Sequence, residues 1–542
     1  MSILSSAVLL ALALVVACFS WSYLAKEKDR FWISQPTIGV RNQRFAWIRA
    51  TLRSLTQTHD WAFEGYGQYS KQNAPFVVPS MDLGPQVIIP PQQIRNVYSL
   101  PEDILDVEET QNQLLQVRWT MRDKIIAQER LHANVVRNQL TRNIKNITET
   151  VADEIDSGFG RTWGTAPTWR EVKIWDTCLR IVAGATNGAF CGQPLCRNPA
   201  FLDCLRDHAM SVFIGALLVN CTPWPLKSLS GIVVGMICKY KLNKAVEICM
   251  PFVKERLEHT AKLKADSSYN WTPPNDGLQW IIEECYSSRD PAAQLDIARV
   301  CHRVVLVNDV SLHTTSFSLQ NFILDLMSAD PSLGYVKTLR RECATVLKQS
   351  NGVWTREALR RLSLVDSAIR ESMRISPIGA IMLSRKVIHP HGMILENSKY
   401  PIPAGTGIGI PIEPIHHDET IYPDARTFHP FRFAQPEEVR RMQGRVMPEV
   451  EAANQAAHSA SQEGGRPKLA TTLDDSFFGF GAGRHACPGR FFALVEMKLF
   501  IAHFLLNYEL EHLETRPRPG NILWMNYPSD ASIRVRKVSM VL

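Results

Sequence analysis

The order of hydrophobic and polar positions along this 542-residue chain predicts a mainly α protein with small β-sheet regions. Long stretches with apolar residues at helical spacing dominate, and the clearest of them are residues 362–375 and 491–506. Short apolar runs at residues 76–79 and 87–89 predict a small early sheet, and residues 383–387 have the pattern of a strand. We therefore expect a mainly helical fold with minor sheets.

The amino-terminal end carries an uncharged stretch at residues 3–24 that is rich in Ala, Leu and Val. At about 1.5 Å per residue it is long enough to cross a bilayer core of roughly 30 Å. Three basic residues follow it directly: Lys26, Lys28 and Arg30. Basic residues after a span hold that side in the cytosol, so we expect a retained single-pass transmembrane helix. The alternative is a cleaved signal peptide, whose basic residues normally precede the apolar core.

Three more segments affect the expected architecture. Apolar residues at 210–219 and 229–237 are separated by the proline-containing segment 222–225, so they are too broken for one membrane span. They predict two helices that either are simply buried or dip into the membrane. Residues 437–475 are polar and contain Gly464-Gly465, which predicts an enlarged loop.

Residues 304–326 form a long apolar stretch whose middle, residues 308–316, reads Asn-Asp-Val-Ser-Leu-His-Thr-Thr-Ser. Hydroxyl groups inside a buried helix compete with its backbone hydrogen bonds and bend or open it. We expect such a distortion here, with a small groove beside it.

The net charge and the distribution of the cysteines restrict the classes of protein to which this chain could belong. The formal charge of +7 is modest for this length and gives no reason to expect nucleic acid, although a basic face would suit an acidic protein partner or anionic lipid. Twelve cysteines are scattered without a regular framework, which is typical of a reducing compartment. The chain has no Gly-x-Gly-x-x-Gly dinucleotide loop, so electrons for any redox reaction must come from another protein.

One cysteine, Cys487, stands in a glycine-rich loop that runs directly into the helical stretch 491–506. A thiolate that binds a metal needs backbone N–H groups near its sulfur and open space around it. We expect positive φ at Gly483 and Gly489, and we expect the helix N-terminus to lower the pKa of the thiol. Arg484 and His485 add cationic donors for carboxylates. Without these neighbours a lone cysteine would be a small buried side chain in a turn.

Residues Phe480, Gly483, His485, Cys487 and Gly489 together resemble the haem-binding loop of the cytochrome P450 superfamily, Phe-x-x-Gly-x-(Arg or His)-x-Cys-x-Gly. The resemblance implies that Cys487 is the axial thiolate ligand of haem b. It also implies that the other four residues contact the cofactor.

A second resemblance lies in Glu371-Ser372-Met373-Arg374 and in the segment 428–433. On its own, Glu-x-x-Arg is a common surface ion pair. In the superfamily, however, this pair and an arginine of the later segment form a buried network, which assigns Glu371, Arg374 and Arg432 to a structural role. Phe431 stands where the family often has Glu.

Residues 310–315 resemble the oxygen-binding helix of the superfamily, (Ala or Gly)-Gly-x-(Asp or Glu)-Thr-Thr. Thr314 matches the alcohol that handles protons, and His313 replaces the usual acid. Both are candidate catalytic residues, because histidine relays protons near neutral pH. The alternative is that both side chains only bond to backbone inside a buried helix.

Haem propionates need paired donors when they are buried. Arg385 matches the family's propionate-binding arginine in the predicted strand, and Arg137 matches the arginine of the family's third helix. The tryptophan of that helix motif is missing. His132 lies one residue off its position, so it is either a further propionate donor or an ordinary residue of an amphipathic helix.

Taken as a whole, the chain resembles the membrane-anchored fungal members of the superfamily. This implies an anchor at residues 1–30, a haem-thiolate catalytic domain at 31–542, and a place in the endoplasmic reticulum membrane with the catalytic domain cytosolic. The implied reaction is O2-dependent oxidation of a lipophilic secondary metabolite (terpenoid, alkaloid or polyketide), with electrons from an NADPH-dependent reductase or cytochrome b5. A haem-thiolate isomerase or dehydratase and a non-catalytic haem-binding protein remain alternatives.

Overall fold

The structure is a computed structural model that describes residues 30–121, 123–396, 398–443, 448, 451–452 and 468–538. The expected membrane anchor at residues 3–24 and the basic residues Lys26 and Lys28 lie outside the described residues. Within the described ranges, no helix combines the length and the apolar character needed to cross a bilayer.

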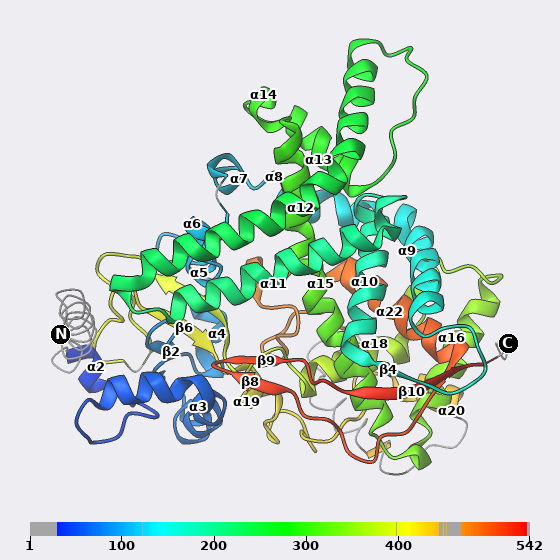
Figure 1. Cartoon of the computed structure of the whole chain (residues 1–542). Helices are drawn as coiled ribbons and strands as arrows, with labels where there is room; N and C mark the ends of the chain where they lie inside the picture. Colours follow the sequence, from blue (N-terminus) through cyan, green and yellow to red (C-terminus); the bar gives the residue numbers. More distant parts are fainter. Residues whose placement is uncertain are drawn as a thin grey trace, which may run out of the picture.

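The described chain is mainly helical (Figure 1), as the hydrophobic pattern predicts. The α-helices are α2 (Arg30–Ser34), α3 (Ala46–Gln68), α4 (Pro91–Tyr98), α5 (Glu108–Leu114), α6 (Val117–Thr120), α7 (Lys124–Gln128), α8 (Leu131–Asn134), α9 (Thr141–Thr162), α10 (Ile174–Phe190), α11 (Pro199–Cys221), α12 (Trp224–Ala265), α13 (Gly277–Tyr286), α14 (Pro291–Gln294), α15 (Ile297–Met327), α16 (Tyr335–Gln349), α17 (Arg356–Arg360), α18 (Ser363–Ile375), α19 (Ile412–His416), α20 (Pro436–Gln443) and α22 (Arg490–Asn507). A π-helical segment, η2 (Val135–Leu140), joins α8 to α9, and short 3₁₀ turns include η5 (Gly483–His485). The predicted helices at 362–375 and 491–506 are α18 and α22.

Three small sheets accompany the helices. Their strands are β1 (Phe76–Val78), β2 (Gln86–Ile88), β3 (Leu105–Asp106), β4 (Arg170–Lys173), β5 (Met382–Val387), β6 (Gly407–Ile410), β7 (Tyr508–Leu510), β8 (Gly520–Ile522), β9 (Met525–Tyr527) and β10 (Ser532–Lys537). The largest has the order β1-β2-β6-β5-β3, with only β2 and β6 parallel. The others are β4-β10-β7 and β8-β9. The three runs predicted as strands correspond to β1, β2 and β5.

Helix α15 lies at the centre of the helical part, and α10, α11, α12, α18 and α22 all pack against it (Figure 1). Because it is covered on several sides, most of its residues are buried, including polar ones such as Asn308 and Asp309. The sheet β1-β2-β6-β5-β3 contributes to a second, separate apolar core with residues such as Val87 and Ile408. The cysteine loop lies between these two cores, because Phe480 belongs to the first and Phe478 to the second.

Two expectations about local structure are wrong. Helix α15 runs unbroken through residues 308–316, because hydroxyls such as those of Thr314 and Ser316 bond to the carbonyl four residues earlier, without interrupting the helix. The polar segment 437–475 is not simply a loop, because its first residues belong to α20, which packs against α16. Residues 444–447, 449–450 and 453–467 of that segment lie outside the described residues.

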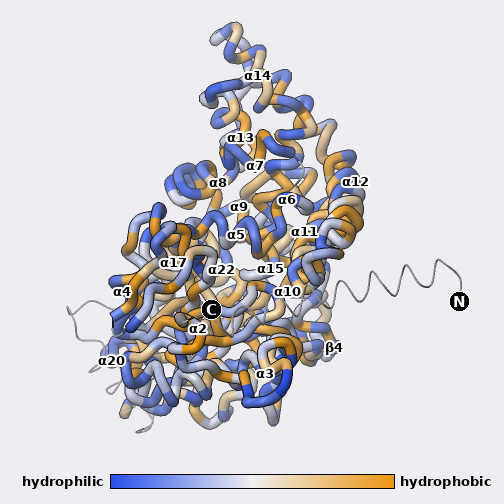
Figure 2. Tube along the Cα trace, turned by 90° about the vertical axis from the view of Figure 1, so that its left-hand side faces the viewer, coloured by the Kyte–Doolittle hydropathy of each residue, from blue (hydrophilic) through white to orange (hydrophobic). Residues whose placement is uncertain are grey.

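The apolar segments 210–219 and 229–237 lie in α11 and α12, and they are buried on one side only. Val212, Val219 and Val234 pack between the two helices. Other apolar side chains of the same helices are more than 40% exposed: Ile214, Leu218, Trp224, Leu226, Leu229, Ile232, Val233, Met236, Ile237 and Tyr240. Hydrophobic stretches of both helices are visible in Figure 2. Helix α12 continues for 42 residues, with Pro251 inside it.

Candidate functional site

The loop that carries Cys487 is held closed by its own backbone, and its thiol is accessible. The N–H of Cys487 donates to the carbonyl of Phe480 at 2.8 Å, and α22 begins three residues after the cysteine. Cys487 is exposed, the Arg490 N–H donates to its carbonyl at 3.4 Å, and the N–H groups of Gly489 and Arg490 favour the charged form of its sulfur. The helix N-terminus therefore does point N–H donors at the sulfur, as the spacing predicts.

Gly483 and Gly489 lack a side chain for different structural reasons. Gly483 has φ +60°, the left-handed conformation expected for it. Gly489 has φ −85°, so the expectation of a positive φ there is wrong. A Cβ on Gly489 would lie 4.0 Å from Cys487 Sγ and 3.9 Å from Val136 Cγ1. Glycine at 489 therefore leaves the space beside the sulfur open.

The pKa of the Cys487 thiol is raised, contrary to the expectation from the helix N-terminus. Burial has the largest effect and raises it, and it outweighs the N–H groups of Gly489 and Arg490 and the charge of Arg490. A metal ion on the sulfur would supply the missing positive charge, because a coordinating thiol is deprotonated.

Three arginines and one histidine gather at the loop: Arg137, Arg385, Arg484 and His485. Arg385 on β5 is only 7% exposed and forms no salt bridge within the described part of the chain. Its guanidinium lies over the ring of Tyr98, and burial lowers its pKa, as does the nearby charge of Arg484. Burial and the charges of Arg385, Arg484 and Arg137 lower the pKa of His485, whose Nε2 is 3.2 Å from Glu102. The site thus has an excess of cationic donors, which suits a pair of carboxylates.

The structure places His132 apart from that cationic group in its electrostatic contacts. Burial lowers its pKa to about 3, and the next contributions come from Arg303, His302 and Arg130. Its Nδ1 is buried and has no hydrogen-bond partner among the described residues. His132 is therefore a neutral side chain with one unused ring nitrogen. The structure does not show it joining Arg385 and His485.

Glu371, Arg374 and Arg432 are brought together in a fully buried network. Arg374 Nε and Nη2 each donate to Glu371 at 2.8 Å, and Arg432 Nε lies 3.0 Å from both carboxylate oxygens. Both arginines also donate to backbone carbonyls of the segment 416–427. The network therefore joins α18 to the chain that leads to the cysteine loop. Phe431 packs edge-on against Tyr335 instead of joining it.

Thr314 lies on an accessible face of the otherwise buried helix α15. It is exposed, and so is Val310 one turn earlier, while Thr315 and Ser316 are buried. One turn later on the helix, Ser318 lines a small cavity of about 80 Å³ together with Phe478, Gly479 and Gly481, which directly precede the cysteine loop's turn. This face of α15 thus opens toward the loop that carries Cys487.

His313 packs among aromatic side chains of other helices. Its ring stacks on Trp175 of α10 and meets Phe213 of α11 edge-on, both at 6.0 Å between centroids. Burial lowers its pKa to about 4, so it is neutral at pH 7. The Thr314 hydroxyl donates to the carbonyl of Val310 and not to His313, and the described residues offer no partner to His313 Nε2.

Sequence reasoning missed two buried polar pairs on α15. Asn308 and Asn187 exchange amide hydrogen bonds of 2.8 and 3.2 Å. Asp309 Oδ1 lies 2.9 Å from His208 Nδ1 of α11. The signal for Asn308 and Asp309 was their place inside an apolar helix, but nothing in the sequence identifies their partners.

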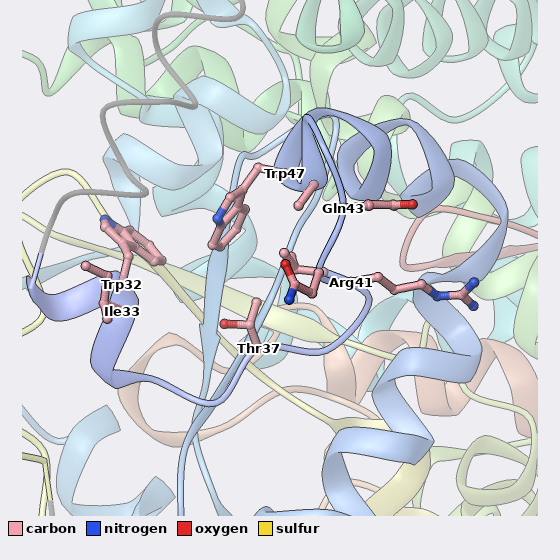
Figure 3. A pocket seen from close by; sticks show the side chains of 9 residues that line it. Trp32, Ile33, Thr37, Arg41, Gln43 and Trp47 are labelled. Atoms are coloured by element: carbon pink, nitrogen blue, oxygen red, sulfur yellow. The ribbon is translucent and has the colours of Figure 1, made fainter.

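A larger cavity, about 530 Å³, lies between α2 and the start of α3 (Figure 3). Its labelled side chains include the indoles of Trp32 and Trp47 with Thr37 near them. None of the predicted site residues lines this cavity. This cavity is therefore separate from the cysteine loop.

The residues at the loop fit a haem group. The accessible sulfur of Cys487 receives N–H donors, the face of α15 with Thr314 opens toward the loop, and a buried guanidinium of Arg385 lacks a carboxylate partner. A propionate would satisfy that guanidinium, and iron would take the sulfur.

Comparison with known proteins gives the same result. Residues 232–528 match the family described as Cytochrome P450. The chain is 40% identical over 542 residues to the cytochrome P450 monooxygenase okaG of Penicillium ochrochloron, covering 99% of this chain and 100% of that protein. It is 32% identical to gloP of Glarea lozoyensis (94% and 91% covered) and to htyF of Aspergillus rugulosus (95% and 74%), both also cytochrome P450 monooxygenases. The chain belongs to the cytochrome P450 family, whose cofactor is haem.

Proposed function

We propose that this chain is a haem-thiolate monooxygenase that oxidises a lipophilic secondary metabolite of the terpenoid, alkaloid or polyketide kind. The observation that carries the proposal is the accessible thiol of Cys487, which accepts backbone N–H groups from Gly489 and Arg490. The monooxygenases okaG, gloP and htyF support the reaction class. Hydroxylation, multi-step oxidation and oxidative coupling all use such a site.

When bound, the haem supplies reductive activation of O2. In this proposal Cys487 would bind the haem iron through its sulfur, and the N–H groups of Gly489 and Arg490 would stabilise the negative charge on that sulfur. Arg137, Arg385 and His485 hold the propionates, with His485 neutral and donating one N–H. Phe480, Gly483 and Gly489 shape the loop, and His132 is a further neutral donor.

The hydroxyl of Thr314 handles protons in this proposal. It donates to the carbonyl of Val310 at 3.0 Å, so its oxygen is held at the accessible face of α15 and can accept a proton and pass one on. His313 lies next to it in the sequence but buries its ring between α10 and α11. Its lowered pKa suits it to accept and release a proton only briefly.

The membrane context is also a proposal. Residues 1–30 form the anchor and residues 31–542 the cytosolic catalytic domain at the endoplasmic reticulum. The exposed apolar side chains of α11 and α12 support contact with a bilayer as well, in preference to two simply buried helices. Electrons come from an NADPH-dependent reductase, with cytochrome b5 as a second donor.

The test is the absorption spectrum of the reduced, carbon-monoxide-bound protein. We expect a strongly red-shifted Soret band in wild type and in Cys204→Ala, and its loss in Cys487→Ala. A haem-replete wild type without that band contradicts the ligand assignment. Dependence of turnover on O2 and NADPH then separates a monooxygenase from an isomerase, a dehydratase or a non-catalytic haem protein.

A further inference from the structure

Helices α15 and α11 share a buried acid–base pair that the proposed mechanism does not yet use. Asp309 is 5% exposed and His208 is 1% exposed, and Asp309 Oδ1 is 2.9 Å from His208 Nδ1. Such a short contact holds a proton between the two atoms in either tautomer. Asp309 and His208 therefore hold one proton between them inside the protein.

Three nitrogen and oxygen atoms near this pair lack partners among the described residues: Asp309 Oδ2, His208 Nε2 and His313 Nε2. Buried polar atoms of this kind bind ordered water when no protein group reaches them. Asp309 and His313 are four residues apart on one helix, so their Cβ atoms are about 5–6 Å apart on the same face. One water can bridge them.

We propose that Asp309, paired with His208, is the buried acid that feeds protons through water and His313 to Thr314. The inference rests on the proposed monooxygenase function. In this inference the acid is Asp309, which lies one helical turn before His313. Each proton that leaves Asp309 is replaced from solvent through His208, and the electrons come from the reductase.

The groups around Asp309 and His208 prevent these two residues from forming a permanent ion pair. Burial raises the pKa of Asp309, against the opposing effect of His208. The other titratable groups within electrostatic reach of the pair are His302 on α15, whose pKa burial lowers to about 4, and Cys238 on α12. Arg206 of α11 acts on His313 and, with burial, keeps that ring neutral. Asp309 thus holds a proton more readily than an ordinary aspartate, and it lies one helical turn from the neutral ring of His313.

The simpler reading is that the pair only fastens α11 to α15, and the variant Asp309→Asn separates the two. Its side chain has the same shape and still accepts a hydrogen bond from His208, but it holds no transferable proton. With reductase, NADPH and O2, and no added substrate, we expect NADPH-dependent O2 consumption to fall on the order of 10-fold to 100-fold. We also expect a larger solvent deuterium isotope effect.

A second readout does not depend on turnover. At a pH of about 5, above the ordinary aspartate range, the infrared difference spectrum of wild type minus Asp309→Asn should contain the carbonyl band of a protonated carboxyl group that shifts in D2O. Buried Glu342 and Glu496 contribute equally to both proteins and cancel.

The matched control is Asn308→Ala, which removes the neighbouring buried pair with Asn187 but no ionisable group. It should lower the unfolding temperature and leave the isotope effect and the carboxyl band unchanged. If Asp309→Asn is folded, shows the wild-type carbon-monoxide spectrum and keeps the wild-type rate and isotope effect, the proposal is overturned. Loss of that spectrum in wild type itself would instead contradict the monooxygenase function.

Discussion

Arg432 lies across the carboxylate of Glu371, with its Nε 3.0 Å from both oxygens. All of these atoms are buried, and Arg374 binds the same carboxylate from within α18. Burial alone would raise the pKa of Glu371, but the two guanidiniums and the hydrogen bonds to them lower it to about 2. The carboxylate is therefore charged at any physiological pH and depends on both arginines.

Replacing Arg432 should consequently destabilise the protein strongly. Arg432→Ala leaves the buried carboxylate with one charged partner, Arg374, and removes the contacts to the Pro423 and Asp424 carbonyls. We therefore expect a loss of about 3–5 kcal/mol in the free energy of unfolding. Arg432→Lys should recover little, because lysine lacks the planar fork. Denaturant unfolding measures both. The exposed pair of Arg180 with Asp176 is the control, and Arg180→Ala should change stability by less than about 1 kcal/mol.

The network of Glu371, Arg374 and Arg432 also predicts that the folded protein loses stability at low pH. Because the folded-state pKa of Glu371 lies below its ordinary 4.5, its contribution is fully present above pH 4.5 and is lost as pH falls from there through about 2. We expect the unfolding temperature of wild type to drop across this window. The drop should be smaller in Glu371→Gln, which is less stable at neutral pH. Parallel curves for the two proteins would contradict the assignment.

We expect the contribution of Glu496 to stability to depend on pH in the opposite direction to that of Glu371. It is fully buried on α22, accepts a hydrogen bond from Thr186, and burial raises its pKa to about 8. A raised folded-state pKa gives a contribution that is present below pH 4.5 and is lost as pH rises through about 8. The stability of Glu496→Gln relative to wild type should therefore rise with pH between these limits, by up to about 5 kcal/mol. Thermal unfolding at several pH values measures the difference, with Thr186→Val as a control that removes only the donor.

Arg385 predicts the strength of haem retention. Its buried guanidinium lacks a salt bridge among the described residues, so we expect Arg385→Leu to fold but to release haem at least about tenfold faster, one lost charged hydrogen bond being about 1.5–3 kcal/mol. Transfer of haem to an excess of apomyoglobin measures the rate. Lys173→Ala, which breaks an exposed pair with Asp530, should release haem as wild type does. Equal rates in Arg385→Leu and wild type would remove Arg385 from the cofactor site.

Thr314→Val tests the proton-handling role of the hydroxyl. The side chains have nearly the same shape and position 314 is exposed, so stability should change by less than about 1 kcal/mol. We expect a larger share of the consumed O2 to appear as hydrogen peroxide, because proton delivery slows. Peroxide formed per NADPH is the measurement. Ser316→Ala, at a buried position that bonds only to Leu312, should keep the wild-type ratio, and a wild-type ratio in Thr314→Val would assign the hydroxyl a purely local role.

Much of this molecule follows from local sequence. The stretch 362–375 matches α18 within one residue, and the three apolar runs match β1, β2 and β5, because side-chain periodicity reports directly on burial. The grouping of Glu371, Arg374 and Arg432 followed from a family resemblance. Periodicity alone could not have joined residues 58 positions apart.

Other features depend on tertiary packing. The sequence could not predict that burial outweighs the helix N-terminus at Cys487, because the balance depends on atoms from distant segments. Helix α15 is unbroken because the helices packed around it support it, and this packing outweighs the effect of its hydroxyl groups. His208 was missed for a similar reason, since its partner Asp309 lies 101 positions away on another helix.

Helix α12 is long and has a proline inside it. Its 42 residues would span about 63 Å at 1.5 Å per residue, and Pro251 divides it unequally, with the exposed apolar side chains on the longer arm. Proline removes one backbone hydrogen bond, so it is the point at which such a rod pivots. A tilt of about 10° there would move the Trp224 end by roughly 7 Å over an arm of about 40 Å. A small rotation at Pro251 would therefore become a large displacement at the exposed apolar end of α12.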